Sequence, residues 1–428
     1  MGHSHSHAPQ PETEQGQKIR HKANLILTAI LLPVFLIAIS CLLILWPSSI
    51  NGGIRIANPY SAPEGASLDT GVVMSTGFEN CQGNQGSASK ECFVAYTQPD
   101  RGGEQISVPV NANTVNTHGV KPGDKIKYVN LTNISTGSGG LSNYAFIDFV
   151  RTIPIGILAG LYALTVILVA GWKGIRAVLG LIVAYAIIAG FILPGIINGL
   201  PSLPITVIGS TAILFAVMYF SHGFSARTST ALLGTLFGLF TTAGITMLAM
   251  GTTYITGLAD ESNHALLNNV PGISLSGIII CGMIIASLGV LNDVTITQAS
   301  AVWELAELSP KTPGREIFKS AMKIGKDHIA STVYTISFAY VSTALPVLML
   351  ALLYDRTLMD SLTGPDLVEE VVRTLVGSIG LVLAVPITTA IAVIVVKSSQ
   401  RNTQTENSGE VELKPSANQE EQTTETSS

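Results

Sequence analysis

Eight blocks of apolar residues stand out along the chain, each about as long as a helix must be to cross a bilayer. The hydrocarbon core of a bilayer is about 30 Å thick, which takes roughly 20 helical residues. The blocks cover residues 23–46, 152–171, 175–193, 204–220, 230–250, 275–293, 329–353 and 374–396, and the sixth can continue past residue 293. The pattern predicts an all-α polytopic membrane protein with about eight transmembrane helices.

The first block has a basic flank like that of a secretory signal peptide, because Lys18, Arg20 and Lys22 precede it. The apolar part of a signal peptide spans about 7 to 15 residues and ends at a cleavage site of small residues. This block is longer and ends at Trp46 and Pro47. We therefore interpret it as a retained first helix.

Lysine and arginine are concentrated in alternate connections between the blocks. With the N-terminus placed in the cytoplasm, the connections at 194–203 and 251–272 are outside and contain neither residue, and the last outer loop contains only Arg356 and Arg373. The inner connections carry Lys173, Arg176, Arg227, Lys311, Arg315, Lys319, Lys323, Lys326, Lys397 and Arg401. Short cytoplasmic loops are enriched in these residues. Both termini are therefore expected in the cytoplasm, and the segment between the first two helices outside it.

This outer segment, residues 47–148, is rich in glycine, asparagine, serine and threonine and contains short alternating runs such as "CFVAYT" and "DKIKYVN". Such runs indicate strands. The turn at Lys121-Pro122-Gly123-Asp124 precedes one of them, with proline presetting φ and glycine supplying a positive one. We expect a small OB-like barrel or a sandwich of about five strands.

Cys81 and Cys92 are the cysteines of this outer segment. In an oxidising compartment they can form a disulfide, which would stabilise so short a loop by roughly 2 to 3 kcal/mol. Free thiols are the alternative, and a metal site would need more ligands than His118 adds. Cys41 and Cys281 lie in apolar helices and are expected in the core.

The overall composition, with 12% charged and 47% hydrophobic residues, excludes a wholly soluble protein. There is no basic patch for nucleic acid, and no phosphate loop, HExxH or GxSxG motif, so neither an enzyme nor a cofactor is expected. Residues 1–22 form an expected cytoplasmic tail with His3, His5 and His7, which bind metal weakly or have no function. The acidic, polar residues 397–428 are expected to be disordered.

The segment "GVLNDVTITQASAVWELAEL" has the strongest chemical pattern. At helical spacing one stripe contains Gly289, Asp293, Thr297, Ser300, Glu304 and Glu307, with Asn292 beside it. The next helix repeats polar residues at Asp327, Ser331 and Thr335, with His328 and Thr332 adjacent. A carboxylate near the bilayer centre costs about 2.5 to 3.5 kcal/mol and should face the bundle or a wet cavity.

Asp293 and the Asp327–His328 pair are expected on the same membrane side of consecutive antiparallel helices, where they can approach each other. A carboxylate facing an imidazole can exchange protons in the physiological pH range. The plainer alternatives are that Asp293 meets lysine or water at the interface, and that Asp327 is a first-turn charge favoured by the helix dipole. His222 and Arg227, in the connection "YFSHGFSARTST", are secondary candidates.

The segments "GVLNDVTITQAS", "GKDHIASTVYTISFAYVSTALP" and "SHGFSARTSTALLGT" resemble the YibE/F family of bacterial multi-pass membrane proteins. The resemblance covers roughly residues 23–396. It implies a bacterial inner-membrane protein with one helix, a small outer β domain and a helical block, in a family described as permeases without an established substrate. The order of elements is also distantly similar to proton-driven exporters of the resistance-nodulation-division class and to Sec accessory subunits. That likeness implies a proton-relay role for Asp293.

Two hypotheses of different classes follow. The first is a proton- or ion-coupled permease that exports a small solute, a lipid precursor or a metal ion. The second is an accessory or scaffold protein that contacts the bilayer through its helices and a cell-envelope partner through the outer domain. The sequence leaves the substrate and the oligomeric state open.

Overall fold

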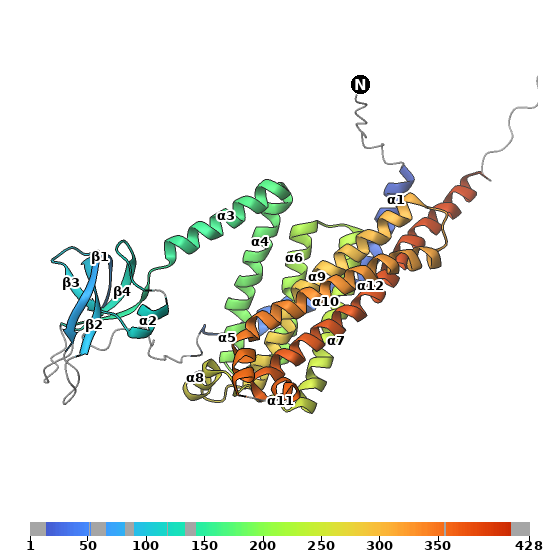
Figure 1. Cartoon of the computed structure of the whole chain (residues 1–428). Coiled ribbons are helices and arrows are strands. Elements are labelled where there is room, and N and C mark those ends of the chain that lie inside the picture. The colour runs from blue at the N-terminus through green and yellow to red at the C-terminus, as the bar shows by residue number, and fades with distance from the viewer. Residues whose placement is uncertain are drawn as a thin grey trace, which may run out of the picture. The chain divides into compact units, whose positions relative to one another are not determined.

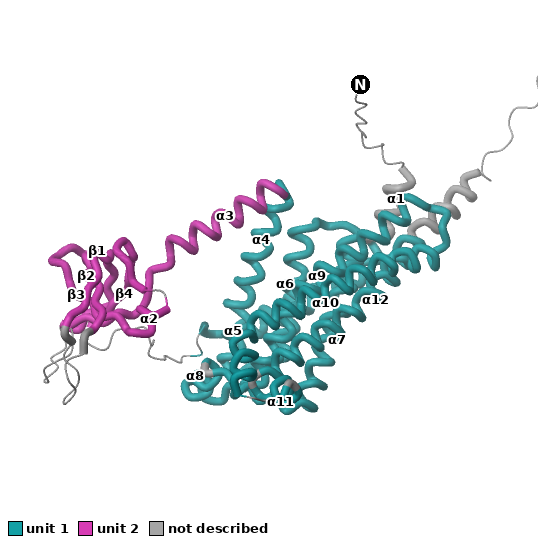
Figure 2. The backbone as a smooth tube through the Cα atoms, viewed as in Figure 1, with its two compact units in different colours: residues 1–54, 170–428 teal, residues 55–169 magenta. Residues whose placement is uncertain are grey.

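The computed structural model describes residues 14–50, 52, 66–81, 90–117, 119–132, 143–354 and 357–411. The chain divides into two compact units, one of Met1–Ile54 with Ala170–Ser428 and the other of Arg55–Val169 (Figure 2). Among the described residues, eight helices are long and apolar enough to cross a membrane: Leu25–Ile44, Thr152–Ala170, Trp172–Ile197, Ser202–His222, Ala226–Thr253, Leu275–Leu308, Gly314–Leu353 and Leu367–Ser398. The predicted number of spans is thereby confirmed on length and composition.

The smaller unit contains an antiparallel sheet whose strand order is β3-β2-β1-β4-β5. The strands are β1 (Ser67–Cys81), β2 (Lys90–Pro99), β3 (Ile106–Pro109), β4 (Lys125–Asn130) and β5 (Tyr144–Phe149), with the short helix α2 (Ala112–Thr117) between β3 and β4. The edge strands β3 and β5 also lie near each other, so the sheet curls. Alternation places Val73, Val108, Ile126 and Tyr128 in one buried cluster. The described residues therefore form one curled antiparallel sheet, and the expected OB-like barrel stays a prediction.

The turn before β4 has the geometry that the sequence predicts. Gly123 has a φ of +94°. The backbone N–H of Lys121 donates to Oδ2 of Asp124 at 2.8 Å, and the N–H of Gly123 donates to the carbonyl of Val73 at 2.7 Å. The turn therefore fixes β4 against the middle of β1.

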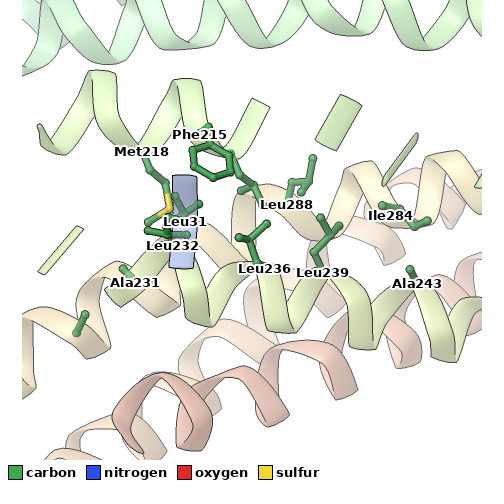
Figure 3. Packing of buried hydrophobic residues seen from close by; sticks show 12 residues of the cluster. Leu31, Phe215, Met218, Ala231, Leu232, Leu236, Leu239, Ala243, Ile284 and Leu288 are labelled. Carbon is green, nitrogen blue, oxygen red and sulfur yellow. The ribbon is translucent and has the colours of Figure 1, made fainter. Parts of the chain in front are cut away.

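The larger unit is helical (Figure 1). Its elements are α1 (Glu14–Ile44), α4 (Trp172–Ile187), the π-helical turn Ile188–Ile192, α5 (Leu193–Ile197), α6 (Ser202–His222), α7 (Ala226–Thr253), α8 (Glu261–Asn269), α9 (Leu275–Leu308), α10 (Gly314–Leu353), α11 (Leu358–Thr363) and α12 (Pro365–Val411). Helices α7, α9 and α12 pack on one another at its centre. The main apolar cluster joins α1, α6, α7 and α9, and Figure 3 shows Leu31, Met218 and Leu232 of this cluster lying together.

Glycines bring α7 and α12 close together. A Cβ at Gly234 of α7 would overlap the side chain of Thr388, and a Cβ at Gly380 of α12 would overlap the hydroxyl of Thr242. Between these contacts, a Cβ at Gly238 would lie 3.1 Å from that of Ala384. The GxxxG pair Gly234 and Gly238 therefore acts in close helix packing, as small residues do in membrane bundles.

Several helix ends differ from the sequence-based boundaries. Helix α9 is continuous over 34 residues, so it does not end near Asp293. Helix α10 begins at Gly314, so Asp327 lies well inside it and the interpretation as a first-turn charge is wrong. Helix α12 begins at Pro365 and is described as helix to Val411, so Arg373 belongs to a helix and is not a loop residue.

Candidate functional site

The centre of the candidate site is a carboxylate and an imidazole on neighbouring helices. Oδ2 of Asp293, on α9, lies 3.9 Å from Nε2 of His328, on α10. The side chain of Asp293 is 70% exposed and that of His328 is 30% exposed. Nε2 of His328 and Oδ1 of Asn292 are buried atoms with no hydrogen-bond partner among the described residues. The approach of Asp293 to His328 that the helix spacing predicts is thus present, at a distance too long for a hydrogen bond.

Asp293 also faces a pocket of about 420 Å³ in the larger unit. Four helices supply its lining: Lys173 from α4, Ser221 and His222 from α6, Arg227 and Thr228 from α7, and Asp293, Ile296, Thr297 and Ser300 from α9. The structure therefore brings the primary candidate Asp293 and the secondary candidates His222 and Arg227 into one cavity, which consecutive-helix spacing does not predict.

Arg227 lies between this pocket and a second one. Its Nη1 is 3.7 Å from Oε1 of Glu304, with side chains 47% and 64% exposed. The second pocket measures about 340 Å³ and is lined by Phe224, Ser225, Ala226, Arg227, Trp303, Glu304 and Glu307. An ion pair this open and this long is a weak one. Arg227 is therefore free to take part in either pocket.

The N-cap and the turn at the start of α7 place Arg227 at the pocket. Ser225 is the N-cap, and its hydroxyl accepts from the backbone N–H of Thr228 at 3.1 Å. Gly223, just before it, has a φ of +75°, a conformation that glycine adopts without strain. The chain can thus reverse tightly after His222 at the end of α6, which brings His222 and Arg227 to the same pocket.

The other predicted residues have separate places. Asp327 is exposed on α10 and is not part of the described pocket linings. Thr297 lines the larger pocket and donates from its hydroxyl to the carbonyl of Asp293 at 2.8 Å. Cys92 is disulfide-bonded. The side chain of Cys81, its expected partner, is outside the described part, so the pairing remains a prediction. His3, His5 and His7 also lie outside the described residues, among which no cluster of His, Cys, Asp or Glu is suited to a metal ion.

Two further residues lie in or near the site, and the sequence reasoning assigned neither of them to it. In the sequence analysis Lys173 served only as evidence that its connection is cytoplasmic, yet it lines the pocket. Gln298, 2% exposed, follows the pocket stripe on α9 and donates to the carbonyl of Ala321 at 2.9 Å and to the hydroxyl of Thr389 at 2.8 Å. A glutamine within an apolar block was the available signal, because such a side chain must find partners when buried.

A second charged cluster lies elsewhere on α12. Arg373 donates to Oε1 of Glu370 at 2.6 Å and also to Oε1 of Glu369. Their side chains are only 19%, 25% and 24% exposed, respectively. The guanidinium lies 5.9 Å from the ring centroid of Tyr340 on α10. The spacing of three and four residues was the sequence signal for this cluster, and it was missed because Arg373 was assigned to a loop.

Eight candidate spans and ionisable groups at helix–helix contacts define this chain as an integral membrane protein. The family model described as YibE/F-like protein matches residues 158–398, and the chain belongs to this family. The resemblance noted from the three motifs is thereby confirmed. The search of curated proteins finds no match, and neither does the search of solved structures.

Proposed function

We propose that this protein is a proton- or ion-coupled permease that exports a small solute, with Asp293 as the group that gains and loses the proton. The observation that carries the proposal is the position of Asp293, which faces a pocket and lies 3.9 Å from His328 within candidate membrane spans. A carboxylate at such a place is costly, so a functional role is the expected reason for it.

Asp293 and His328 would work as a coupled pair. When the carboxylate is ionised and the imidazole protonated, they attract each other, and when Asp293 is protonated that attraction is lost. The change in attraction would act between α9 and α10, because one group belongs to each helix. Proton uptake would therefore be linked to the relative position of the two helices.

The orientation belongs to the same proposal. The basic connections support a bacterial cytoplasmic membrane location with both termini inside and the five-stranded sheet outside. In that orientation Lys173, His222 and Arg227 are near the cytoplasmic ends of their helices. The pocket would then open toward the cytoplasm, which is the side from which an exporter loads.

The test uses proteoliposomes containing the purified full chain and a pH-sensitive dye, with candidate solutes and divalent metals added in turn. We expect a solute-triggered pH change with the wild type and with Asp327→Asn, a matched acid on α10 outside the pocket. Asp293→Asn should reduce the rate by tenfold or more, about the effect of losing a proton carrier. An Asp293→Asn variant as active as the wild type would refute the role of Asp293.

The compact sheet unit, which has a buried cluster of its own, supports the accessory hypothesis as a second candidate. A strain lacking the protein separates the two. If the protein is an accessory scaffold, Asp293→Asn restores the phenotype fully and a chain without residues 67–149 does not. If it is a permease, Asp293→Asn fails to restore it.

A further inference from the structure

The lining of the larger pocket is dominated by basic and hydroxyl side chains. The basic residues Lys173 and Arg227 belong to it, and so does His222. Asp293 is the acidic residue among the described lining residues. The hydroxyl groups that complete the lining are those of Ser221, Thr228, Thr297 and Ser300. The hydroxyls of Thr297 and Ser300 already donate to backbone carbonyls of α9, so the donors that the pocket offers a ligand are chiefly those of its basic side chains. The lining thus contains more positive than negative charge, with N–H donors of the kind that bind an oxyanion.

The beginning of α7 adds to this field. Arg227 and Thr228 lie in the first turn of a 28-residue helix, where the helix dipole is positive. The dipole would not make a site on its own, but here it coincides with the cavity and with two cationic side chains. The carboxylates of Glu304 and Glu307 line the neighbouring pocket and not this one. The long, exposed contact between Glu304 and Arg227 leaves the guanidinium able to turn to a ligand.

We propose that this pocket binds a small oxyanion, such as a phosphate group, and that protonation of Asp293 strengthens the binding. This inference rests on the proposed function, since it names the class of substrate. An ionised Asp293 repels an anion in the same cavity, and its neutral form does not. The groups that face Asp293 from other helices are Lys173, His222, Arg227 and His328. A proton and an anion would therefore enter the site together, which is a direct physical basis for coupling them.

The size of the cavity agrees with a ligand larger than inorganic phosphate. A volume of about 420 Å³ falls within the range of roughly 300 to 1,000 Å³ typical of small-molecule pockets. The ligand class thus includes a phosphate-bearing solute and the phosphate head group of an anionic lipid. Both share the chemistry that the pocket recognises, and the experiment below distinguishes them.

Binding is measured with radiolabelled inorganic phosphate by equilibrium dialysis of the full chain in neutral detergent. We expect saturable binding that weakens about tenfold in Lys173→Gln and in Arg227→Gln, since each loses a charge-assisted hydrogen bond. Arg176→Gln is the matched control, because Arg176 is exposed on α4 one turn from Lys173 and outside the pocket lining. It should change binding less than about twofold. Lys173→Arg keeps the charge and should keep the binding, which separates a binding defect from misfolding.

The role of Asp293 is read from the same measurement. Asp293→Asn should tighten phosphate binding and remove the part of its pH dependence that comes from the carboxylate, while the part that comes from histidines and from phosphate itself remains. Nanodiscs of phosphatidylcholine are then compared with nanodiscs containing phosphatidylglycerol. Loss of phosphate binding in the second identifies a lipid head group as the occupant, and unchanged binding identifies a free solute.

The inference is overturned if phosphate does not bind saturably, or if Lys173→Gln and Arg227→Gln bind as the wild type does. Its failure is separable from that of the proposed function. Proton movement that depends on Asp293, without phosphate binding, would keep the permease and reject the anion. Phosphate binding that depends on Lys173, with proton movement unaffected by Asp293→Asn, would keep the anion site and reject the role of Asp293 in proton-coupled transport.

Discussion

Replacing Arg373 by glutamine tests whether the buried charges of α12 compensate one another. The guanidinium serves both Glu369 and Glu370, and all three side chains are at least three-quarters buried. Glutamine keeps a polar side chain of moderate length but removes the positive charge. Two largely buried carboxylates then remain close together without the guanidinium that paired with both of them.

The cost follows from the burial. Breaking a buried ion pair by removing one partner typically costs 3 to 5 kcal/mol, because an uncompensated charge is left behind. The two glutamates can take up a proton and so avoid part of this cost. We therefore expect Arg373→Gln to lower the free energy of unfolding by about 3 kcal/mol, toward the lower end of the range. Adding Glu369→Gln and Glu370→Gln removes the unpaired charges and should restore all but about 1 kcal/mol.

The assay is unfolding of the purified protein in mixed micelles with a rising fraction of dodecyl sulfate, followed by tryptophan fluorescence. Arg151→Gln is a matched control, since Arg151 also pairs with an acid three residues away, Asp148 at 2.7 Å, but on an exposed surface. It should leave the transition unchanged. The reasoning is refuted if Arg373→Gln behaves like Arg151→Gln, or if the triple variant is as unstable as Arg373→Gln alone.

Two further predictions concern packing and pH. Gly234→Ala should lower the free energy of unfolding by about 1 to 3 kcal/mol, because the added Cβ overlaps Thr388. Gly244→Ala on the same helix is the control, since its Cβ meets no described atom within 4 Å, and it should be neutral or slightly stabilising in the same assay. Hydrogen bonds from Lys125 and Thr70 lower the pKa of Asp100, so the ionised carboxylate stabilises the sheet. This stabilisation is fully present above the unfolded pKa near 3.9 and is lost as the pH falls through the lower folded pKa. The hydrogen-exchange protection factor, which corrects for the intrinsic pH dependence of exchange, should therefore fall at the end of β2 below about pH 4 in the wild type and fall less in Asp100→Asn. Equal acid sensitivity of the two would contradict this.

Hydropathy predicts where the chain can lie in lipid, but it does not predict where a helix begins. The eight apolar blocks correspond to eight candidate spans. Their ends differ because helical hydrogen bonding continues through charged turns. Helix α10 starts at Gly314 and so includes Arg315, Lys319 and Lys323, which carry no apolar signal. For the same reason α12 includes Arg373, which loop counting placed outside the helix.

Sequence patterns predicted the part of the site that comes from consecutive helices, but not the part that comes from helices further away in the sequence. Asp293 and His328 lie on consecutive helices at matching depth, so spacing alone brings them near each other. Lys173 and His222 come from α4 and α6, and their approach to Asp293 depends on which helices pack side by side. A single hydropathy pattern holds no information on that packing, since every apolar face can pack on several partners.

The Arg373 cluster and the Asp293–His328 pair of the larger unit differ in exposure and contact distance, and the proposed permease would use them differently. Around Arg373 the carboxylates are within bonding distance and three-quarters buried, so moving a proton there would break strong contacts. Asp293 is 70% exposed, and its imidazole partner is 3.9 Å away with a nitrogen that lacks a hydrogen bond among the described residues. Eleven residues separate Asp293 from Gly282, the α9 residue beside Arg373, which is about 16 Å along the helix. A proton-driven step needs a pair that forms and breaks at little cost, and it needs helices that are anchored elsewhere. In the proposed permease, the Arg373 cluster would keep its contact with Tyr340 of α10 while the contact between Asp293 and His328 opens and closes.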